Sequence, residues 1–193
     1  MATSNRTPEL SLAGKLMFIP NVGRILLAVA TRLITSPFNS GPKANTFFKD
    51  IVFAALRKNL SIITPEQEQW VNPTTESVYL DFTKKAKFQP DTDVLPSGQK
   101  AHWLGAKSAQ KIILYFHGGG YVLAASSGHF EWLFELQQEM GKEHSVSAVL
   151  PSYTLAPRGQ YPEQMKQGVE CLDWLINTVG KKSSDVSMLL SRL

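Results

Sequence analysis

The sequence predicts an α/β fold built on a mostly parallel sheet. Residues 112–116 form an unbroken apolar run, IILYF, which is typical of a strand buried on both faces of such a sheet. Further downstream, short apolar runs alternate with helical patterns, and that order favours parallel strands joined by right-handed crossovers. At 193 residues the chain is long enough to bury a sizeable core.

The first element is an apolar stretch, residues 16–34. Pro20, Asn21, Gly23, Arg24 and Arg32 interrupt it, so we expect it to be too broken for a membrane-spanning helix. It also lacks the small-residue cleavage pattern of a signal peptide. Two interpretations remain open: an amphipathic helix that covers the rest of the fold, or a helix that lies on a membrane surface.

Two more helices are expected before the sheet begins. Residues 45–60 form the first, with Asn45 as its cap and one apolar face, and residues 64–67 (TPEQ) have the spacing of a capping box that starts a short second one. Residues 77–82 and 101–104 then read as strands. We expect them to form an antiparallel entry to the mostly parallel sheet.

The second half alternates helix and strand. Residues 128–141 carry a helical pattern, residues 146–150 an apolar strand, and Pro162 opens a long helix that ends at Gly180. Cys171 lies in that helix, where a buried side chain is the expected role. The residues expected on the apolar face of this helix are Met165, Val169, Leu172 and Ile176.

Composition and charge exclude several functions. The formal charge is +4, and the Lys and Arg residues are dispersed without a long basic run, which argues against a nucleic-acid-binding protein. The single cysteine permits no disulfide within the chain and suits a reducing compartment. The four histidines show no metal-ligand spacing, so we expect neither a metal nor another cofactor.

The run HGGG, residues 117–120, follows the central strand and precedes a helix. Glycine amides in such a turn either cradle a phosphate or form an oxyanion hole, and the phosphate-binding patterns G-x-x-x-x-G-K-[ST] and G-x-G-x-x-G are absent. The HGGG run, with Y-T-L-A-P at residues 153–157 and Y-P at 161–162, resembles the hormone-sensitive-lipase-like branch of the α/β-hydrolases. Arg158 stands where that family usually has Glu.

The resemblance implies a hydrolase of carboxylic esters, acting on a small-molecule ester. Gly118, Gly119 and Gly120 would form its oxyanion hole, and His117 would brace the loop without moving protons. Related hydrolases carry N-terminal helices over the acyl pocket, which favours a cap for residues 16–34 over weak membrane contact. We therefore expect a helical cap region in residues 1–70 and the N-terminal half of a hydrolase domain in residues 71–193. The oligomeric state is left open.

The family's nucleophile and triad are not found in the sequence. The serine should lie in G-x-S-x-G, followed by Asp and His, and no G-x-S-x-G occurs here. Residues 187–193 resemble the helix beyond that elbow more than the strand before it, so we expect a loss of the elbow by deletion or misjudged splicing. Ser126, Ser127 and His129 are an unconvincing substitute, because neighbours in sequence rarely align as nucleophile and base. The rival hypothesis is a non-catalytic relative that binds a ligand or partner.

The resemblance extends over most of residues 41–182 to fungal hydrolases, several of which serve secondary-metabolite and toxin pathways. The chain ends in Ser191-Arg192-Leu193, a close variant of the S-K-L peroxisomal signal. We therefore expect a peroxisomal location, with the cytoplasm as the alternative.

Overall fold

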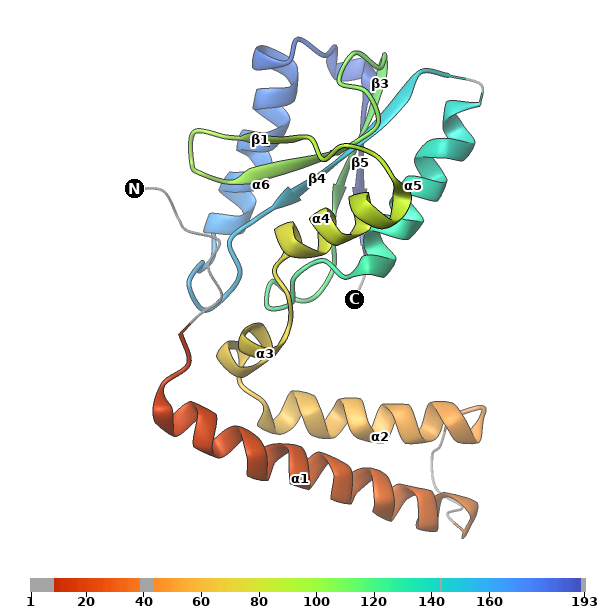
Figure 1. Ribbon diagram of the computed structural model, residues 1–193, viewed down its shortest axis with the longest axis vertical. Coiled ribbons are helices and arrows are strands. Elements are labelled where there is room, and N and C mark those ends of the chain that lie inside the picture. Colours follow the sequence, from red (N-terminus) through yellow and green to blue (C-terminus); the bar gives the residue numbers. More distant parts are fainter. Residues whose placement is uncertain (1–8, 39–43, 143, 192–193) are drawn as a thin grey trace. The chain divides into compact units, whose positions relative to one another are not determined.

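The computed structural model describes residues 9–38, 44–142 and 144–191. Contacts divide the chain into a helical unit, Pro8–Val71, and an α/β unit that contains Asn72–Leu193 (Figure 1). The expected boundary between residues 70 and 71 falls beside this division. That the helical unit covers an acyl pocket stays a prediction.

The helical unit consists of a long helical hairpin and a short third helix. Its elements are α1 (Leu12–Thr35), the 3-10 turn η1 (Ser36–Phe38), α2 (Phe47–Ile62) and α3 (Pro65–Val71). Thr46, not Asn45, caps α2, because its side chain accepts from the amide of Lys49 at 3.2 Å. The capping box of α3 is confirmed by reciprocal bonds between Thr64 and Gln67.

Helix α1 is continuous over 24 residues, and Pro20 lies inside it. The expectation that Pro20 and its neighbours break this stretch is therefore wrong. Among the described residues, one helix, Leu12–Phe38, is long and apolar enough to cross a membrane by length and composition alone. A signal sequence near the N-terminus passes the same test.

Polar contacts fix α1 against α2. Arg32 donates from Nε and Nη2 to the two carboxylate oxygens of Asp50, each at 2.7 Å, and Ser36 donates to the same carboxylate at 2.6 Å. These bonds hold the pKa of Asp50 far below its usual value. Toward the other end of the hairpin, Asn21 donates to the carbonyl of Ile62 at 3.0 Å. The two helices are thus joined near both ends of the hairpin.

The α/β unit is a five-stranded mixed sheet with helices on both faces (Figure 1). The strand order is β1-β2-β4-β3-β5, antiparallel at β1-β2 and β2-β4 and parallel at β4-β3 and β3-β5. Its elements are α4 (Thr75–Ala86), β1 (Thr92–Val94), β2 (Lys100–Leu104), β3 (Lys111–Phe116), α5 (Ser127–Gly141), β4 (Val146–Ser152), α6 (Glu163–Asp173), the π-helical turn η2 (Trp174–Thr178), the 3-10 turn η3 (Ser183–Asp185) and β5 (Val186–Leu190).

Alternate residues of the strands face two separate cores. Ile113 and Tyr115 of β3 pack with α4 and α5, and Ile112 and Leu114 pack with α6 and η2. Cys171 is buried in the second core, as expected, and burial raises its pKa to about 12. The central strand is therefore buried on both faces, as its apolar run predicts.

Residues 77–82 are helical, so the expected strand there is wrong. Thr74 caps α4 by accepting from the amide of Ser77 at 3.2 Å, and Lys87 ends it in the left-handed region. Val78, Tyr79 and Phe82 lie on the buried face at helical spacing. The strand at residues 101–104 is confirmed as β2, and β1 was not expected from the sequence.

Two further expectations at the C-terminal end are corrected. On α6, Met165 and Val169 are exposed, whereas Gln164, Gln167 and Cys171 are buried, so the buried face differs from the predicted one. Residues 186–190 form the parallel strand β5, paired with β3 from Ile112↔Val186 to Phe116↔Leu190, and not a helix. The expected helix at 128–141 and strand at 146–150 are confirmed as α5 and β4.

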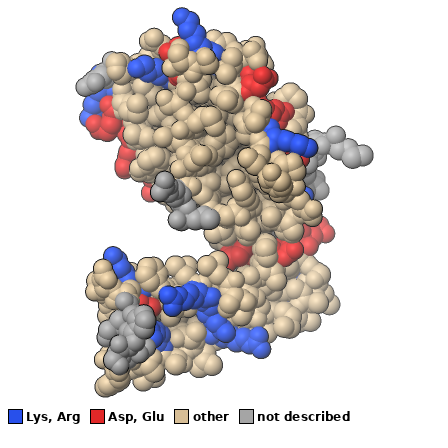
Figure 2. Space-filling model, turned by 180° about the vertical axis from the view of Figure 1, so that it is seen from behind, with Lys and Arg blue, Asp and Glu red and all other residues tan. Residues whose placement is uncertain are grey.

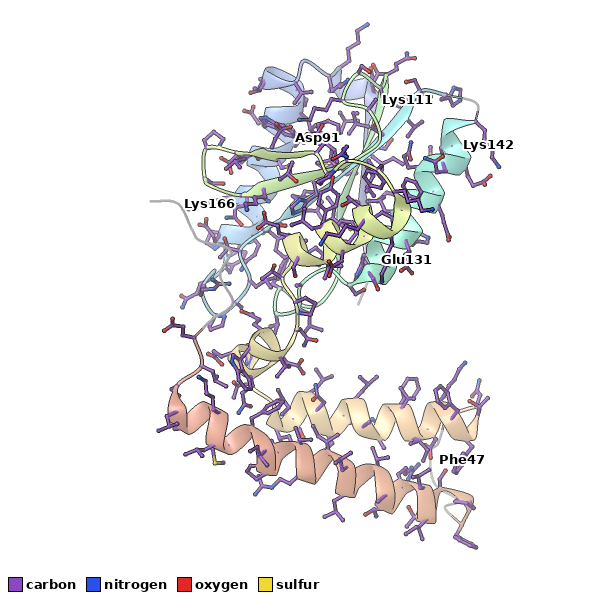
Figure 3. All side chains as sticks on the ribbon, in the orientation of Figure 1. Phe47, Asp91, Lys111, Glu131, Lys142 and Lys166 are labelled. Atoms are coloured by element: carbon purple, nitrogen blue, oxygen red, sulfur yellow. The ribbon has the colours of Figure 1, made fainter. Side chains whose placement is uncertain are left out.

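Tyr79 joins α4 to the first two strands and yields a stability prediction. Its buried hydroxyl donates to the carbonyl of Trp103 at 2.8 Å and accepts from the amide of Asp91 at 2.8 Å; Figure 3 labels Asp91. Tyr79→Phe leaves both backbone groups without this partner, so we expect the free energy of unfolding in urea to fall by about 1–3 kcal/mol. Tyr161→Phe, at an 82% exposed site, is the matched control and should change it little. Equal effects of the two substitutions would contradict this role of the hydroxyl.

Candidate functional site

The loop that follows β3 turns sharply at its glycines. Gly119 and Gly120 have φ of +115° and +59°, and Tyr121 has φ of +60°. A Cβ atom on Gly119 would lie 2.9 Å from Cβ of Leu123 and 3.0 Å from its carbonyl oxygen, so this position requires glycine on two counts. The left-handed conformation of Tyr121 is strained for a residue with a side chain, and such strain is common at functional sites.

The amides of this loop are available to a ligand. Within the described residues, none of the N–H groups of Gly118, Gly119 and Gly120 donates a hydrogen bond. The Gly119 carbonyl instead accepts from the amides of Val122 and Leu123, each at 3.0 Å, which closes the turn. The arrangement leaves several donors of one loop free at the carboxyl end of the central strand.

His117 is buried beneath the loop. Its Nδ1 lies 2.7 Å from the carbonyl oxygen of Gly118, which requires the proton on Nδ1, and its Nε2 has no partner among the described residues. Burial lowers the pKa of His117 to about 4, and nearby His129 lowers it further. The imidazole is therefore neutral near pH 7 and holds the first turn of the loop.

Tyr153 is a second support of the loop that sequence reasoning did not assign. Its ring stacks on His117 with centroids 4.5 Å apart and planes 13° apart, and its hydroxyl donates to the carbonyl of His117 at 2.7 Å. Burial raises the pKa of Tyr153 above its ordinary value. Ala156, three residues on, donates its amide to the carbonyl of Tyr121 at 2.7 Å. The Y-T-L-A-P segment thus fastens both ends of the glycine turn, and that motif was the available signal.

Ser126 and His129 approach each other but form a helix cap. Ser126 Oγ lies 2.8 Å from Nδ1 of His129. The same Nδ1 also accepts the amide of Ser126 at 3.0 Å, the reciprocal pattern of a capping box at the start of α5. Among the described residues no carboxylate hydrogen-bonds to His129. The contact is therefore explained by capping, and Ser127, exposed in the first turn of α5, adds no base.

The other histidines are not brought to the loop. His102 is fully buried in β2, where Nδ1 contacts Thr92 Oγ1 at 3.0 Å and Nε2 contacts Ser152 Oγ at 2.7 Å, and burial lowers its pKa to about 3. His144 is exposed. In the part of the chain that the structure describes, no group of three or more His, Cys, Asp or Glu residues is arranged to hold a metal ion.

The end of β5 lies beside the candidate oxyanion loop. The amide of Ser191, directly after β5, donates to the carbonyl of Phe116 at 3.0 Å, so the two parallel strands end side by side. In sheets of this kind, ligands bind outside the carboxyl ends of the strands. The loop, the Y-T-L-A-P segment and Ser191 therefore meet at one edge of the sheet.

Comparison with known proteins agrees with this geometry. Residues 113–190 match a family described as having the α/β-hydrolase fold. Carboxylesterase 20 of Arabidopsis thaliana is 37% identical over 73 residues, which are 37% of this chain and 22% of that protein. Ethyl acetate hydrolase of Pseudomonas putida is 29% identical over 81 residues, covering 42% of this chain and 24% of that enzyme. The matched part thus spans about a quarter or less of these relatives.

Solved structures of hydrolases also resemble the chain. A crystal structure of EstE5 soaked with p-nitrophenyl butyrate has a TM-score of 0.46 and 25% identity, covering 62% of this chain and 41% of that one. An esterase of Pyrobaculum calidifontis has a TM-score of 0.44 and 17% identity, covering 62% and 44%. The family match over residues 113–190 and the sheet that carries the HGGG loop agree on one conclusion: this part of the chain has the α/β-hydrolase fold.

Proposed function

We propose that this chain supplies the oxyanion loop of a serine hydrolase that cleaves carboxylic esters. The observation that carries the proposal is the set of unpaired amides at Gly118, Gly119 and Gly120, held at the carboxyl end of β3. Donors fixed in advance stabilise the negative charge that develops on a carbonyl oxygen during acyl transfer. Gly119 and Gly120 are the proposed donors, and the named esterases among the relatives support this reaction class.

The printed sequence carries no G-x-S-x-G, so the nucleophile must come from elsewhere for this chemistry to run. Ser191, directly after β5, lies beside Phe116 at the base of the loop, which supports the proposal that the missing elbow belongs at this point of the chain. Sequencing transcripts on both sides of the Ser191 codon tests the idea. A continuation with G-D-S-A-G-G and later Asp and His supports the esterase. Its absence from every transcript supports the rival, a non-catalytic protein that binds an acyl ligand or partner.

Activity of the 193-residue chain gives the first test. We expect no hydrolysis of p-nitrophenyl butyrate above background, because amides alone leave only weak catalysis without a nucleophile and base. Fusing the chain to the downstream half of Pseudomonas putida ethyl acetate hydrolase should restore turnover. Gly119→Ala in the fusion should then lower kcat by roughly 10²–10³-fold, since the methyl group collides with Leu123 and displaces the donor. A fusion that keeps its full rate with Gly119→Ala would show that the loop is not the oxyanion hole.

The control for that substitution is Gly128→Ala in the first turn of α5. Its added Cβ meets only Ser126 Oγ at 3.7 Å, an ordinary contact, so kcat should stay within about twofold. Comparable losses from both substitutions would point to general damage of the fold.

The bracing role proposed for His117 predicts a pH dependence of stability. Its pKa is about 4 when folded and about 6.5 when unfolded, so the neutral form stabilises the fold fully above pH 6.5. That stability is lost as pH falls from about 6.5 to about 4, by up to roughly 1.4 kcal/mol per pH unit. In His117→Asn the free energy of unfolding between pH 7 and pH 5 should fall less steeply than in the wild type. The exposed His144→Asn serves as the control, and identical slopes for wild type and His117→Asn would refute the role.

We further propose that the ester belongs to a fungal secondary-metabolite pathway and that the site of action is the peroxisome. The sequence resemblance to fungal hydrolases supports the first point. The Ser191-Arg192-Leu193 ending supports the second; its last two residues lie outside the described residues. A fluorescent protein fused to the N-terminus should follow a peroxisomal marker and disperse when Leu193 is deleted. Diffuse signal from both forms would end the proposal.

A further inference from the structure

The hairpin of α1 and α2 carries a broad apolar face on the side that α1 turns away from α2. At 100° per residue, six large apolar side chains of α1 share one stripe, and each is between 63 and 74% exposed. They are Leu12, Leu16, Ile19, Leu26, Leu27 and Ile34. On the opposite side of α1, Asn21 and Arg32 hold the helix to α2, so the stripe is the face that the hairpin contacts leave exposed.

Helix α2 carries exposed apolar side chains of its own: Phe48, Phe53, Leu56 and Leu60 are each at least 48% exposed. Soluble monomers rarely leave many large apolar side chains uncovered on one element, and such a stripe marks an interaction site.

The charge of the same segment is strongly one-sided. Residues 10–62 carry seven of the chain's twenty Lys and Arg but only one of its sixteen Asp and Glu, a net +6 against +4 for the whole chain. The single acid, Asp50, is neutralised by Arg32. The described cations that remain are Lys15, Arg24, Lys49, Arg57 and Lys58. On the side shown in Figure 2, blue Lys and Arg side chains lie over this unit beside uncharged residues.

We propose that helices α1 and α2 dock on an anionic phospholipid surface. Their apolar stripe would enter the boundary between headgroups and acyl chains, and their cations would contact lipid phosphates and carboxylates. A second copy of the chain fits less well, because it would bring the same positive charge to the contact. A spanning arrangement would place Arg24 and the Arg32–Asp50 pair within the hydrocarbon, where charges are costly. The helices therefore lie in the plane of the interface.

Co-sedimentation of the full chain with vesicles tests the proposal. We expect binding to phosphatidylcholine vesicles that contain about a third phosphatidylserine, and binding that weakens as salt is raised. Arg24→Gln with Arg57→Gln and Lys58→Gln should lower the affinity by about fivefold per charge removed, so on the order of 10²-fold in all. Equal binding to vesicles without phosphatidylserine, or no binding to either, would overturn the proposal.

A second variant probes the apolar stripe without touching the hairpin's polar contacts. Leu26→Ser with Leu27→Ser should lower the affinity at least tenfold. The matched controls alter exposed residues of the α/β unit: Met165→Ser with Val169→Ser for the apolar pair, and Lys84→Gln with Lys85→Gln for the charges. Losses no larger than those of the controls would refute the docking surface.

Folding and self-association are followed on the same samples. Helical circular dichroism of the Leu26→Ser, Leu27→Ser variant should match the wild type, so that lost binding reports lost contact. Sedimentation velocity without vesicles should show no dimer that the variant dissolves. Such a dimer, together with absent vesicle binding, would assign the stripe to a second copy of the chain and overturn the proposal.

Discussion

The structure of the α/β unit depends on burying one strand, β3, on both faces and along both edges. The backbone of β3 pairs with β4 on one side and with β5 on the other. Its side chains point alternately into the two hydrophobic cores. A strand fixed this completely can end in an irregular loop without losing its position. The HGGG turn therefore inherits the rigidity of the sheet, and Tyr153 needs to support only its first residue, His117. Free amides in a rigid loop are the arrangement that acyl transfer requires.

The sequence predicted those elements whose signal is local. The run 112–116 and the HGGG motif are recognisable without any partner, as are the capping box at Thr64 and the helix 128–141. Residues 77–82 were misread because Val78, Leu80 and Phe82 alternate like a strand, while Val78, Tyr79 and Phe82 also fit a helix. The cap at Thr74 favours the helix over the strand, and Leu80 then lies on the exposed face of that helix.

Elements whose structure depends on partners distant in sequence could not be predicted from local patterns. Residues 186–190 become a strand because β3 offers an unpaired edge, whereas a segment this short and mostly apolar fits a helix equally well in isolation. On α6, Gln164 and Gln167 are buried because their amides bond the backbone or side chain of Thr154, while the apolar Met165 and Val169 stay outside. The buried face of α6 is therefore set by hydrogen bonds of polar side chains to a distant partner, and not by the positions of the apolar residues. The contact of Tyr153 with His117 is likewise long-range, spanning 36 residues.

The distribution of charge in the folded hairpin likewise differs from its distribution along the sequence. Along the sequence the cations of residues 10–62 are dispersed, and no basic run marks them. Folding brings α1 and α2 together as one hairpin, whose single acid, Asp50, is already paired with Arg32; Glu9, Glu66 and Glu68 of the same unit lie outside the two helices. The formal charge of +4 is therefore the sum of +6 on residues 10–62 and −2 on the rest of the chain. Electrostatic attraction acts over about a Debye length, roughly 8–10 Å in physiological salt, so a surface responds to the local value and not to the average. For a hairpin that is also apolar on its outer face, the net charge of the hairpin itself therefore determines its electrostatic attraction to a surface.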